Sequence, residues 1–416
     1  MRIMMSLSRS LAVGAALACL AGCGSSNSST HTALTNPGSS GANGSSGGDS
    51  NASAGSGPIT MGMSTAAQVA AKLGKPSKFL IGMGNDLNND HSKDGAYTLG
   101  VTLDIHYAYL TAYQQNGGFH SWVEWNPDGS FVNVMTDSAS EHGVVPMFTM
   151  YEMAAVGDGN IKGALMTDAF EKLYWSDMKT LFKRLGAFDK PAIVHIEPDF
   201  WAYAQQQSNG DPTKMQVSLK NNEPDCAELS NDLVGMGHCL VKLARKYAPK
   251  TLLGFHASQW AGEASATAAF LKACGAGDTD VVFADLLDRD AGCFEAHTDP
   301  NCQRGGAFYW DENNQTSPNF HEYLAWSKGI SSGVGLPLIW WQIPLGVPST
   351  TPGGSAGHYR DNRVHYIFSH IHEFIDAGGV AAAFGTGAER QTFIDTDGGQ
   401  FKNAVTAYLA KPVALP

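Results

Sequence analysis

The sequence predicts an α/β fold, a (β/α)8 TIM barrel preceded by a signal peptide and a disordered Gly/Ser-rich tether. Two observations predict the barrel. From residue 75 onward, short β-rich apolar runs alternate with longer amphipathic stretches, and eight such pairs follow one another without interruption. Alternation of this kind is typical of parallel strands joined by helical crossovers, and a series of eight is the number that closes a barrel.

The expected strands are apolar runs rich in Val, Ile, Phe and Leu. They are Phe79–Asp86, Leu103–Leu110, Val144–Met153, Ala192–Asp199, Thr251–Trp260, Val281–Asp288, Leu336–Ile343 and Gly379–Gly387. A doubly wound sheet is the alternative. Such sheets often carry a Gly-rich phosphate loop that opens a helix directly after the first strand, and no helix start follows Gly82 to Asp86 closely.

Apolar residues between the strands recur at helical spacing. Three such series are Leu229, Leu233, Met236, Leu240 and Leu243; then Val364, Ile367, Phe368, Ile371, Phe374 and Ile375; and last Phe401, Val405, Tyr408 and Leu409. Ser317–Pro318 resembles a capping serine with proline at the first helical position, and we expect it to open a helix over Phe320 to Ile330.

Composition excludes several classes of protein. The 416 residues are 43% hydrophobic and 16% charged, which supplies enough apolar material for a large core. The net charge is -12 and no run of Lys or Arg occurs, so binding to nucleic acid is not expected. We expect a monomer that uses no cofactor and touches the membrane only through its N-terminus.

The N-terminus resembles a bacterial lipoprotein signal. Arg2 and Arg9 precede an apolar run from Leu11 to Leu20, which is too short to span a bilayer. The following Leu20-Ala21-Gly22-Cys23 resembles the lipobox, which implies cleavage before Cys23 and lipidation of its thiol. Gly24 lacks the acidic character of an inner-membrane retention signal, so we expect an envelope protein anchored in the outer membrane or on the cell surface.

Three segments follow from these observations. Residues 1–22 are the expected signal peptide, 23–58 a lipidated flexible linker, and 59–416 the (β/α)8 catalytic domain. The linker consists almost entirely of Gly, Ser, Asn, Ala and Thr, which cannot bury a core. Five cysteines remain in the domain, in an oxidising compartment, and the close pair Cys293 and Cys302 is the expected disulfide. The pairing of Cys226, Cys239 and Cys274 stays open.

The fourth expected strand carries the most informative polar residues. Side chains alternate across a strand, so His195, Glu197 and Asp199 should share the face that points into the barrel mouth. A carboxyl group buried beside histidine and aromatic rings should have a perturbed pKa, the property that a general acid needs. Glu197 is therefore the first candidate for the acid, with a structural pairing to His195 as its alternative.

The same alternation places polar side chains from other strands at the mouth, where barrel active sites are built. The expected substrate-binding set is Asn85, Asp86, His106, Tyr151, His195, Trp201, His256, Gln259, Asp288, Trp340 and Gln342. Aromatic residues in the long loops suit the apolar faces of sugar rings. They are Trp122, Trp125, Trp201, Tyr203 and Trp310.

Two carboxylates that flank a glycosidic bond are the minimum for its hydrolysis. Glu197 and Asp285, on strands that lie on one side of the barrel, are the first choice, with Asp199 and Asp288 as substitutes. At this point the chain resembles secreted (β/α)8 glycoside hydrolases. The acidic pair on the fourth and sixth strands resembles retaining α-galactosidase-like barrels, and Glu197-Pro198-Asp199 is similar to the E-P-D segment of family-six cellulases, which implies that Asp199 is the acid.

The resemblance implies a hydrolase that cleaves glycosidic bonds in an extracellular oligo- or polysaccharide. This expected function has two alternatives. The first is a metal-dependent barrel hydrolase or isomerase, whose ligands would come from His106, His195, His256, Asp104, Glu197 and Asp285. We expect no metal, because the H-x-H of such enzymes is missing from the first strand. The second alternative is a barrel that binds carbohydrate on the cell surface without cleaving it.

The lipobox can be tested by replacing Cys23 with Ala. We expect the Cys23→Ala variant to leave the membrane fraction for the soluble fraction without unfolding, because the thiol that carries the lipid is lost while the domain is untouched. Membrane fractionation and circular dichroism measure both outcomes, and a variant that stays in the membrane fraction would contradict the assignment.

Overall fold

The structure is a computed structural model. It describes residues 64–84, 95–286, 289–297, 300, 302–303, 305–347, 363–387 and 391–416. The expected signal peptide, the linker with Cys23, and three predicted site residues, Asn85, Asp86 and Asp288, lie outside the described residues.

Eight parallel strands close into a barrel. They are β1 (Leu80–Gly84), β2 (Ile105–Gln115), β4 (Val145–Tyr151), β5 (Ala192–Ile196), β6 (Thr251–Ala257), β7 (Val281–Asp285), β8 (Leu338–Ile343) and β9 (Gly379–Phe384). Each pairs in parallel with the next, β9 pairs with β1, and β1 pairs with β2 to complete the circle. The predicted (β/α)8 fold is confirmed, all eight expected strands are present, and the doubly wound alternative is wrong.

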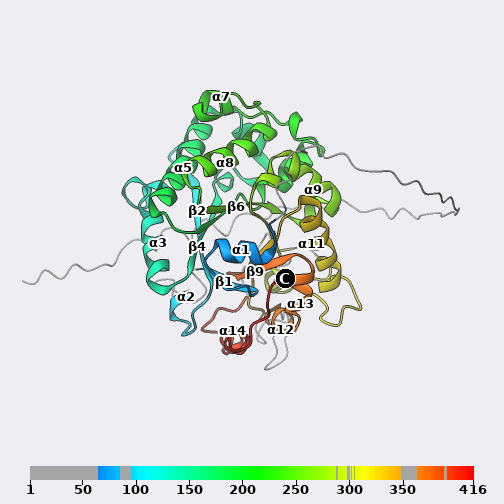
Figure 1. Ribbon diagram of the computed structural model, residues 1–416. Coiled ribbons are helices and arrows are strands. Elements are labelled where there is room, and N and C mark those ends of the chain that lie inside the picture. Colours follow the sequence, from blue (N-terminus) through cyan, green and yellow to red (C-terminus); the bar gives the residue numbers. More distant parts are fainter. Residues whose placement is uncertain are drawn as a thin grey trace, which may run out of the picture.

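Helices surround this barrel. They are α1 (Ala66–Lys72), α2 (Gly95–Thr98), α3 (Phe131–His142), α4 (Ile161–Ala164), α5 (Asp168–Phe188), α6 (Phe200–Gln207), α7 (Leu219–Asn222), α8 (Leu233–Tyr247), α9 (Ala264–Ala273), α10 (Ala291–Ala296), α11 (Phe320–Val334), α12 (Arg363–Ser369), α13 (Ile371–Asp376) and α14 (Gln400–Ala410). Figure 1 looks along the barrel, with α3, α5, α8, α9 and α11 around the strands and α1 across the middle. No helix in the described part of the chain is long and apolar enough to span a bilayer.

Two local predictions need correction. The peptide bond between Ser317 and Pro318 is cis, and the pair precedes the helix α11 instead of opening it. Asn319 is the true N-cap, since its side chain accepts a hydrogen bond from the backbone N–H of Glu322 at 2.9 Å. The apolar series from Val364 to Ile375 forms two helices, α12 and α13, because the backbone leaves helical geometry at His370.

One strand was not predicted. β3 (Gly118–Ser121) pairs antiparallel with the far end of β2, so the second barrel strand continues past the barrel as a hairpin. β2 is 11 residues long, whereas the other barrel strands have 5 to 7.

Two disulfides cross-link the domain. The predicted bond between Cys293 and Cys302 is present, and it ties α10 to the segment that follows it. Cys226 and Cys239 form the second bond, which joins the segment before α8 to the helix itself, and Cys274 is a buried free thiol.

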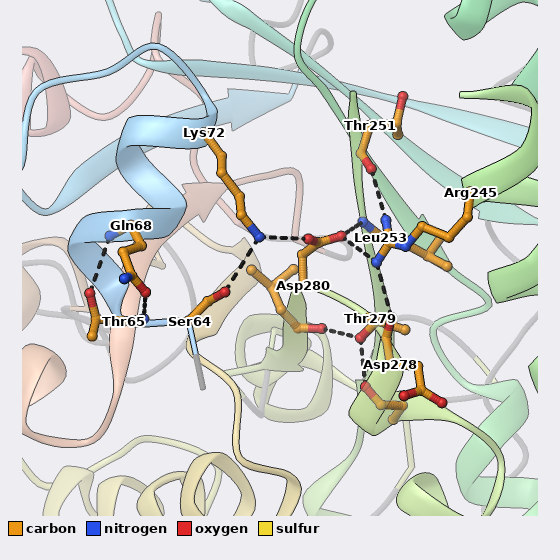
Figure 2. A network of polar contacts seen from close by, with 12 residues as sticks. Ser64, Thr65, Gln68, Lys72, Arg245, Thr251, Leu253, Asp278, Thr279 and Asp280 are labelled. Carbon is orange, nitrogen blue, oxygen red and sulfur yellow. Dashed lines mark hydrogen bonds and ion pairs between the residues drawn. The ribbon is translucent and has the colours of Figure 1, made fainter. Parts of the chain in front are cut away.

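The N-terminal end of the barrel is covered by α1, which is fastened by a buried aspartate. Asp280 stands just before β7, and its carboxylate accepts hydrogen bonds from Lys72 at 3.2 Å, from Arg245 at 2.8 Å and from the backbone N–H of Leu253 at 3.0 Å (Figure 2). The network therefore joins α1, α8 and two barrel strands through one side chain that is only 8% exposed.

Replacing Asp280 tests this network. We expect Asp280→Ala to lower the free energy of unfolding by about 2–4 kcal/mol, because a buried backbone donor and the Arg245 guanidinium lose their acceptor. Lys72→Ala is the matched control. The Lys72 side chain is 47% exposed, so removing this ion pair should cost no more than about 1 kcal/mol. Denaturant titration measures both, and equal losses in the two variants would contradict the central role of Asp280.

Candidate active site

A column of polar side chains rises through the barrel interior on four adjacent strands. Thr149 Oγ1 lies 3.3 Å from His195 Nδ1, and His195 Nε2 lies 3.0 Å from His256 Nδ1. His256 Nε2 then lies 3.6 Å from Oδ1 of Asp285, the last residue of β7. The two histidines are no more than 1% exposed, whereas the Asp285 side chain is 19% exposed. The column therefore begins in the dry interior and ends at the C-terminal mouth.

Asp199 is the second carboxylate of the mouth. It directly precedes α6 and is partly exposed. Tyr151, at the end of β4, donates its hydroxyl to Asp199 Oδ2 at 3.0 Å. Asp199 and Asp285 thus stand after β5 and at the end of β7, with His256 of β6 between their strands.

The surroundings of Asp199 favour its protonated form. Removal of the carboxyl group from water raises the pKa of Asp199 above its usual range, and the nearby Asp285 charge raises it further. His256, Arg289 and the hydrogen bond from Tyr151 act in the opposite direction without reversing the shift. One carboxyl group of the pair is therefore suited to hold a proton.

Aromatic rings line the same interior. The Trp341 ring lies 4.8 Å from the His195 ring and 5.6 Å from Tyr109, and Tyr107 lies below Tyr109 on β2. Gly385 makes room for this cluster, because a Cβ atom there would lie 1.8 Å from the Tyr107 hydroxyl. Tyr109 is partly exposed and can contact a ligand at the mouth.

Sequence reasoning missed Trp341 and chose its neighbours. Strict alternation placed Trp340 and Gln342 inside, but Trp340 is fully buried on the outer face, 5.0 Å from Phe374 of α13. The reason is an irregularity in β8, where Gln342 has a φ of 54° and the register with β9 shifts between Trp340 and Ile343. On β2 the alternation was also read in the wrong phase. The inward residues there are tyrosines, while His106 lies outside, with its ring 4.4 Å from that of Tyr97.

Glu197 does not lie where alternation predicted. The strand ends at Ile196, and Glu197 has a φ of 50°, which turns its side chain off the face that His195 occupies. Its two carboxylate oxygens accept the backbone N–H groups of Glu152 and Met153 at 3.1 and 3.2 Å, and the side chain is fully buried. In this position Glu197 joins the end of β5 to the turn after β4.

Glu197 belongs to a separate group of buried acids. Glu152, Glu171 and Glu197 are 0% exposed and Asp177 is 5% exposed. Burial raises the pKa of Glu152 well above its usual range, and the adjacent Asp177 and Glu197 carboxylates raise it further. Glu152 accepts a hydrogen bond from the Trp122 indole at 3.1 Å. This group lies behind the β4 strand end, toward α5.

Several expected sugar-binding residues are part of the core. Trp201 is 1% exposed, stacks on Phe255 at 4.4 Å and donates to the backbone carbonyl of Ile196. Trp122 and Trp310 are buried as well, whereas Trp125, Tyr203 and Gln259 remain partly exposed. A large aromatic side chain in a loop covers the top of the barrel core as readily as it binds a ligand, and the sequence does not distinguish the two.

The ligand set of the metal-dependent alternative is dispersed. Asp104 pairs with Lys78 at 2.7 Å before β2, at the opposite end of the barrel, and His106 lies on the outer face. In the described residues no group of three or more His, Cys, Asp or Glu side chains is arranged to hold a metal ion.

Comparisons with known proteins find similar solved structures but no matching family. No protein-family model and no curated protein matches the sequence. Among solved structures, GH26C from Muricauda sp. has a TM-score of 0.48 and 11% identity, covering 84% of this chain and 90% of that one. A GH113 β-1,4-mannanase has a TM-score of 0.45 and 10% identity, covering 80% and 99%. The GH53 catalytic domain of Ignisphaera aggregans has a TM-score of 0.46 and 10% identity, covering 80% and 96%. Function is therefore argued from the side chains of this chain.

Glu171 allows a test of the buried acids. Burial raises its pKa to about 8 from 4.5, and the Trp175 indole donates to it at 2.7 Å. Between these values the unfolded chain releases a proton that the folded chain keeps, so stability falls as pH rises from about 4.5 to 8. We expect Glu171→Gln to remove this dependence, which amounts to at most about 1.4 kcal/mol per pH unit.

Denaturant titrations at pH values across this range measure the effect, with the exposed Glu141→Gln as the matched control. The Glu171→Gln variant should gain stability relative to the wild type as pH rises, while the control should follow the wild type. Parallel curves for all three proteins would contradict the assignment.

Proposed function

We propose that this protein hydrolyses glycosidic bonds with Asp199 and Asp285 as its pair of carboxylates. One observation carries the proposal. Two partly exposed acids stand at the C-terminal ends of β5 and β7, close enough for the Asp285 charge to raise the pKa of Asp199. Glycoside hydrolysis needs one carboxyl group that holds a proton and a second that is ionised.

The two acids take different roles. Asp199 donates its proton to the glycosidic oxygen as the bond to the anomeric carbon breaks, so the leaving sugar departs as a neutral alcohol. Asp285 either attacks the anomeric carbon or takes a proton from the attacking water, and in both cases it acts as a carboxylate. The tyrosine hydroxyl of Tyr151 orients the Asp199 carboxyl group.

The walls of the mouth suit a sugar substrate. Tyr109 is partly exposed and offers a flat apolar face, and the partly exposed Asp199 and Asp285 offer polar atoms at the same mouth. A lipid-anchored enzyme of this kind would act on an oligo- or polysaccharide at the cell envelope. A barrel that binds carbohydrate without cleaving it is the competing function, and the same experiment separates the two.

Asparagine variants of both acids test the proposal. We expect Asp199→Asn and Asp285→Asn to lower kcat on oligosaccharides by roughly 10²–10⁴-fold with little change in melting temperature, because each variant removes one chemical role and keeps the side-chain volume. An activated substrate separates the roles. A dinitrophenyl glycoside has a leaving group that needs no proton, so it should restore much of the rate of Asp199→Asn and little of that of Asp285→Asn.

Glu197→Gln is the matched control. The carboxylate of Glu197 accepts hydrogen bonds from two backbone N–H groups, and in the variant the amide NH₂ group would face one of these donors, so one hydrogen bond is lost. We therefore expect a lower melting temperature and unchanged activity per folded molecule. Loss of turnover in Glu197→Gln, with full activity in Asp199→Asn, would reassign the acid to Glu197. If the wild-type protein binds sugars but does not cleave them, the hydrolase proposal would be wrong and carbohydrate binding without cleavage would be the function.

A further inference from the structure

We propose that Thr149 and His195 are positioning residues that fix the tautomer of His256 whose Nε2 carries the proton and faces Asp285. The consequence for catalysis rests on the proposed function, whereas the tautomer itself does not. The column of contacts from Thr149 to Asp285 carries this inference.

The surroundings of His195 determine the charge of its ring. Its ring is fully buried, 4.1 Å from the Phe283 ring and 4.8 Å from that of Trp341. Burial lowers the pKa of His195 well below 6.5, and the neighbouring His256 lowers it further. His195 is therefore a neutral imidazole, with a proton on one nitrogen and a lone pair on the other.

The hydrogen bonds of the column can run in either of two directions. In one direction the Thr149 hydroxyl donates to His195 Nδ1, His195 Nε2 donates to His256 Nδ1, and His256 Nε2 presents its proton to Asp285. With both rings neutral, each ring then donates once and accepts once. In the opposite direction His256 Nε2 carries a lone pair, which would face Asp285 Oδ1 at 3.6 Å.

The Asp285 carboxylate favours one of these two directions. An ionised Asp285 repels the lone pair of the second arrangement and attracts the N–H of the first. Only a protonated Asp285 would fit the second arrangement. The tautomer of His256 and the charge of Asp285 are thus coupled. The hydroxyl of Thr149 favours the same direction, because His195 Nδ1 is its one side-chain hydrogen-bond partner among the described residues, and the buried hydroxyl proton is satisfied only if it is donated to that nitrogen.

The tautomer of His256 affects both acids of the mouth. A proton on His256 Nε2 keeps Asp285 as the carboxylate, and the Asp285 charge in turn favours the proton on Asp199. The other charged or titratable groups around the pair are Arg289, Tyr151 of β4 and Tyr323 of α11, whose hydroxyl donates to the backbone carbonyl of Asp285. None of these groups replaces the contact between His256 and Asp285.

The tautomer can be measured without any substrate. Histidine labelled with nitrogen-15 gives different nitrogen signals for a protonated and an unprotonated ring nitrogen, and a His256→Gln spectrum assigns the peak. We expect wild-type His256 to be protonated at Nε2 at neutral pH. We expect Thr149→Val to give a mixture of tautomers and Thr149→Ser to restore the wild-type spectrum, because serine keeps the hydroxyl and valine keeps only the shape. A wild-type His256 protonated at Nδ1 alone, or a Thr149→Val spectrum identical to the wild type, would overturn the inference.

A second variant keeps the test valid if Thr149→Val does not fold. His195→Gln retains an N–H donor toward His256, whereas His195→Leu removes it, so only the leucine variant should lose the Nε2 tautomer. On an oligosaccharide, the acid limb of the pH–rate profile should move upward by about one pH unit in Thr149→Val and stay in place in Thr149→Ser. If His256 shows the expected tautomer but the protein cleaves no sugar, the proposed function is refuted while this inference about the tautomer still holds.

Discussion

The hydrogen bond between His195 and His256, at 3.0 Å, is the contact on which the barrel interior depends. Two imidazoles in an apolar interior are costly unless their nitrogens are satisfied, and each ring here finds its partner on the next strand. The parallel register of β4, β5, β6 and β7 makes this possible. It sets Thr149 level with His195, and it sets His256 and then Asp285 each two residues further toward the mouth. The surrounding aromatic rings exclude water from the column, and Asp285 lies at its open end.

The buried or partly buried acids near the C-terminal ends of β4, β5 and β7 fall into two groups with different surroundings. Glu152, Asp177 and Glu197 are sealed behind the end of β4, where they hold backbone and helix together. Asp199 and Asp285 reach the mouth, where a substrate can contact them. Both groups contain carboxyl groups with raised pKa values, so a perturbed pKa alone does not identify the chemistry. The candidate catalytic acids are distinguished from the buried structural acids by their exposure at the C-terminal ends of the strands.

The fold could be predicted from the sequence because its signals are long and repeated. Eight apolar runs with helical stretches between them leave few other topologies, and small errors at strand ends do not change the result. The site was harder, because it depends on the orientation of single side chains. Alternation correctly placed His195, His256, Tyr151 and Asp285, and it failed at Glu197 and at Trp340, which precedes the irregularity at Gln342. Glu197 and Gln342 have positive φ values, 50° and 54°, and neither residue type indicates that conformation in a sequence.

The position of α1 has a consequence for how substrate reaches the barrel. Because α1 covers the N-terminal end of the strands, Ser64, which contacts Lys72 of α1 (Figure 2), lies on the face opposite the mouth. A support joined to the domain at Ser64 would therefore attach at the closed end of the barrel and leave the open end unobstructed. Approach by a polymer would then be limited by the width of the mouth, while the supporting surface would stand clear of its path.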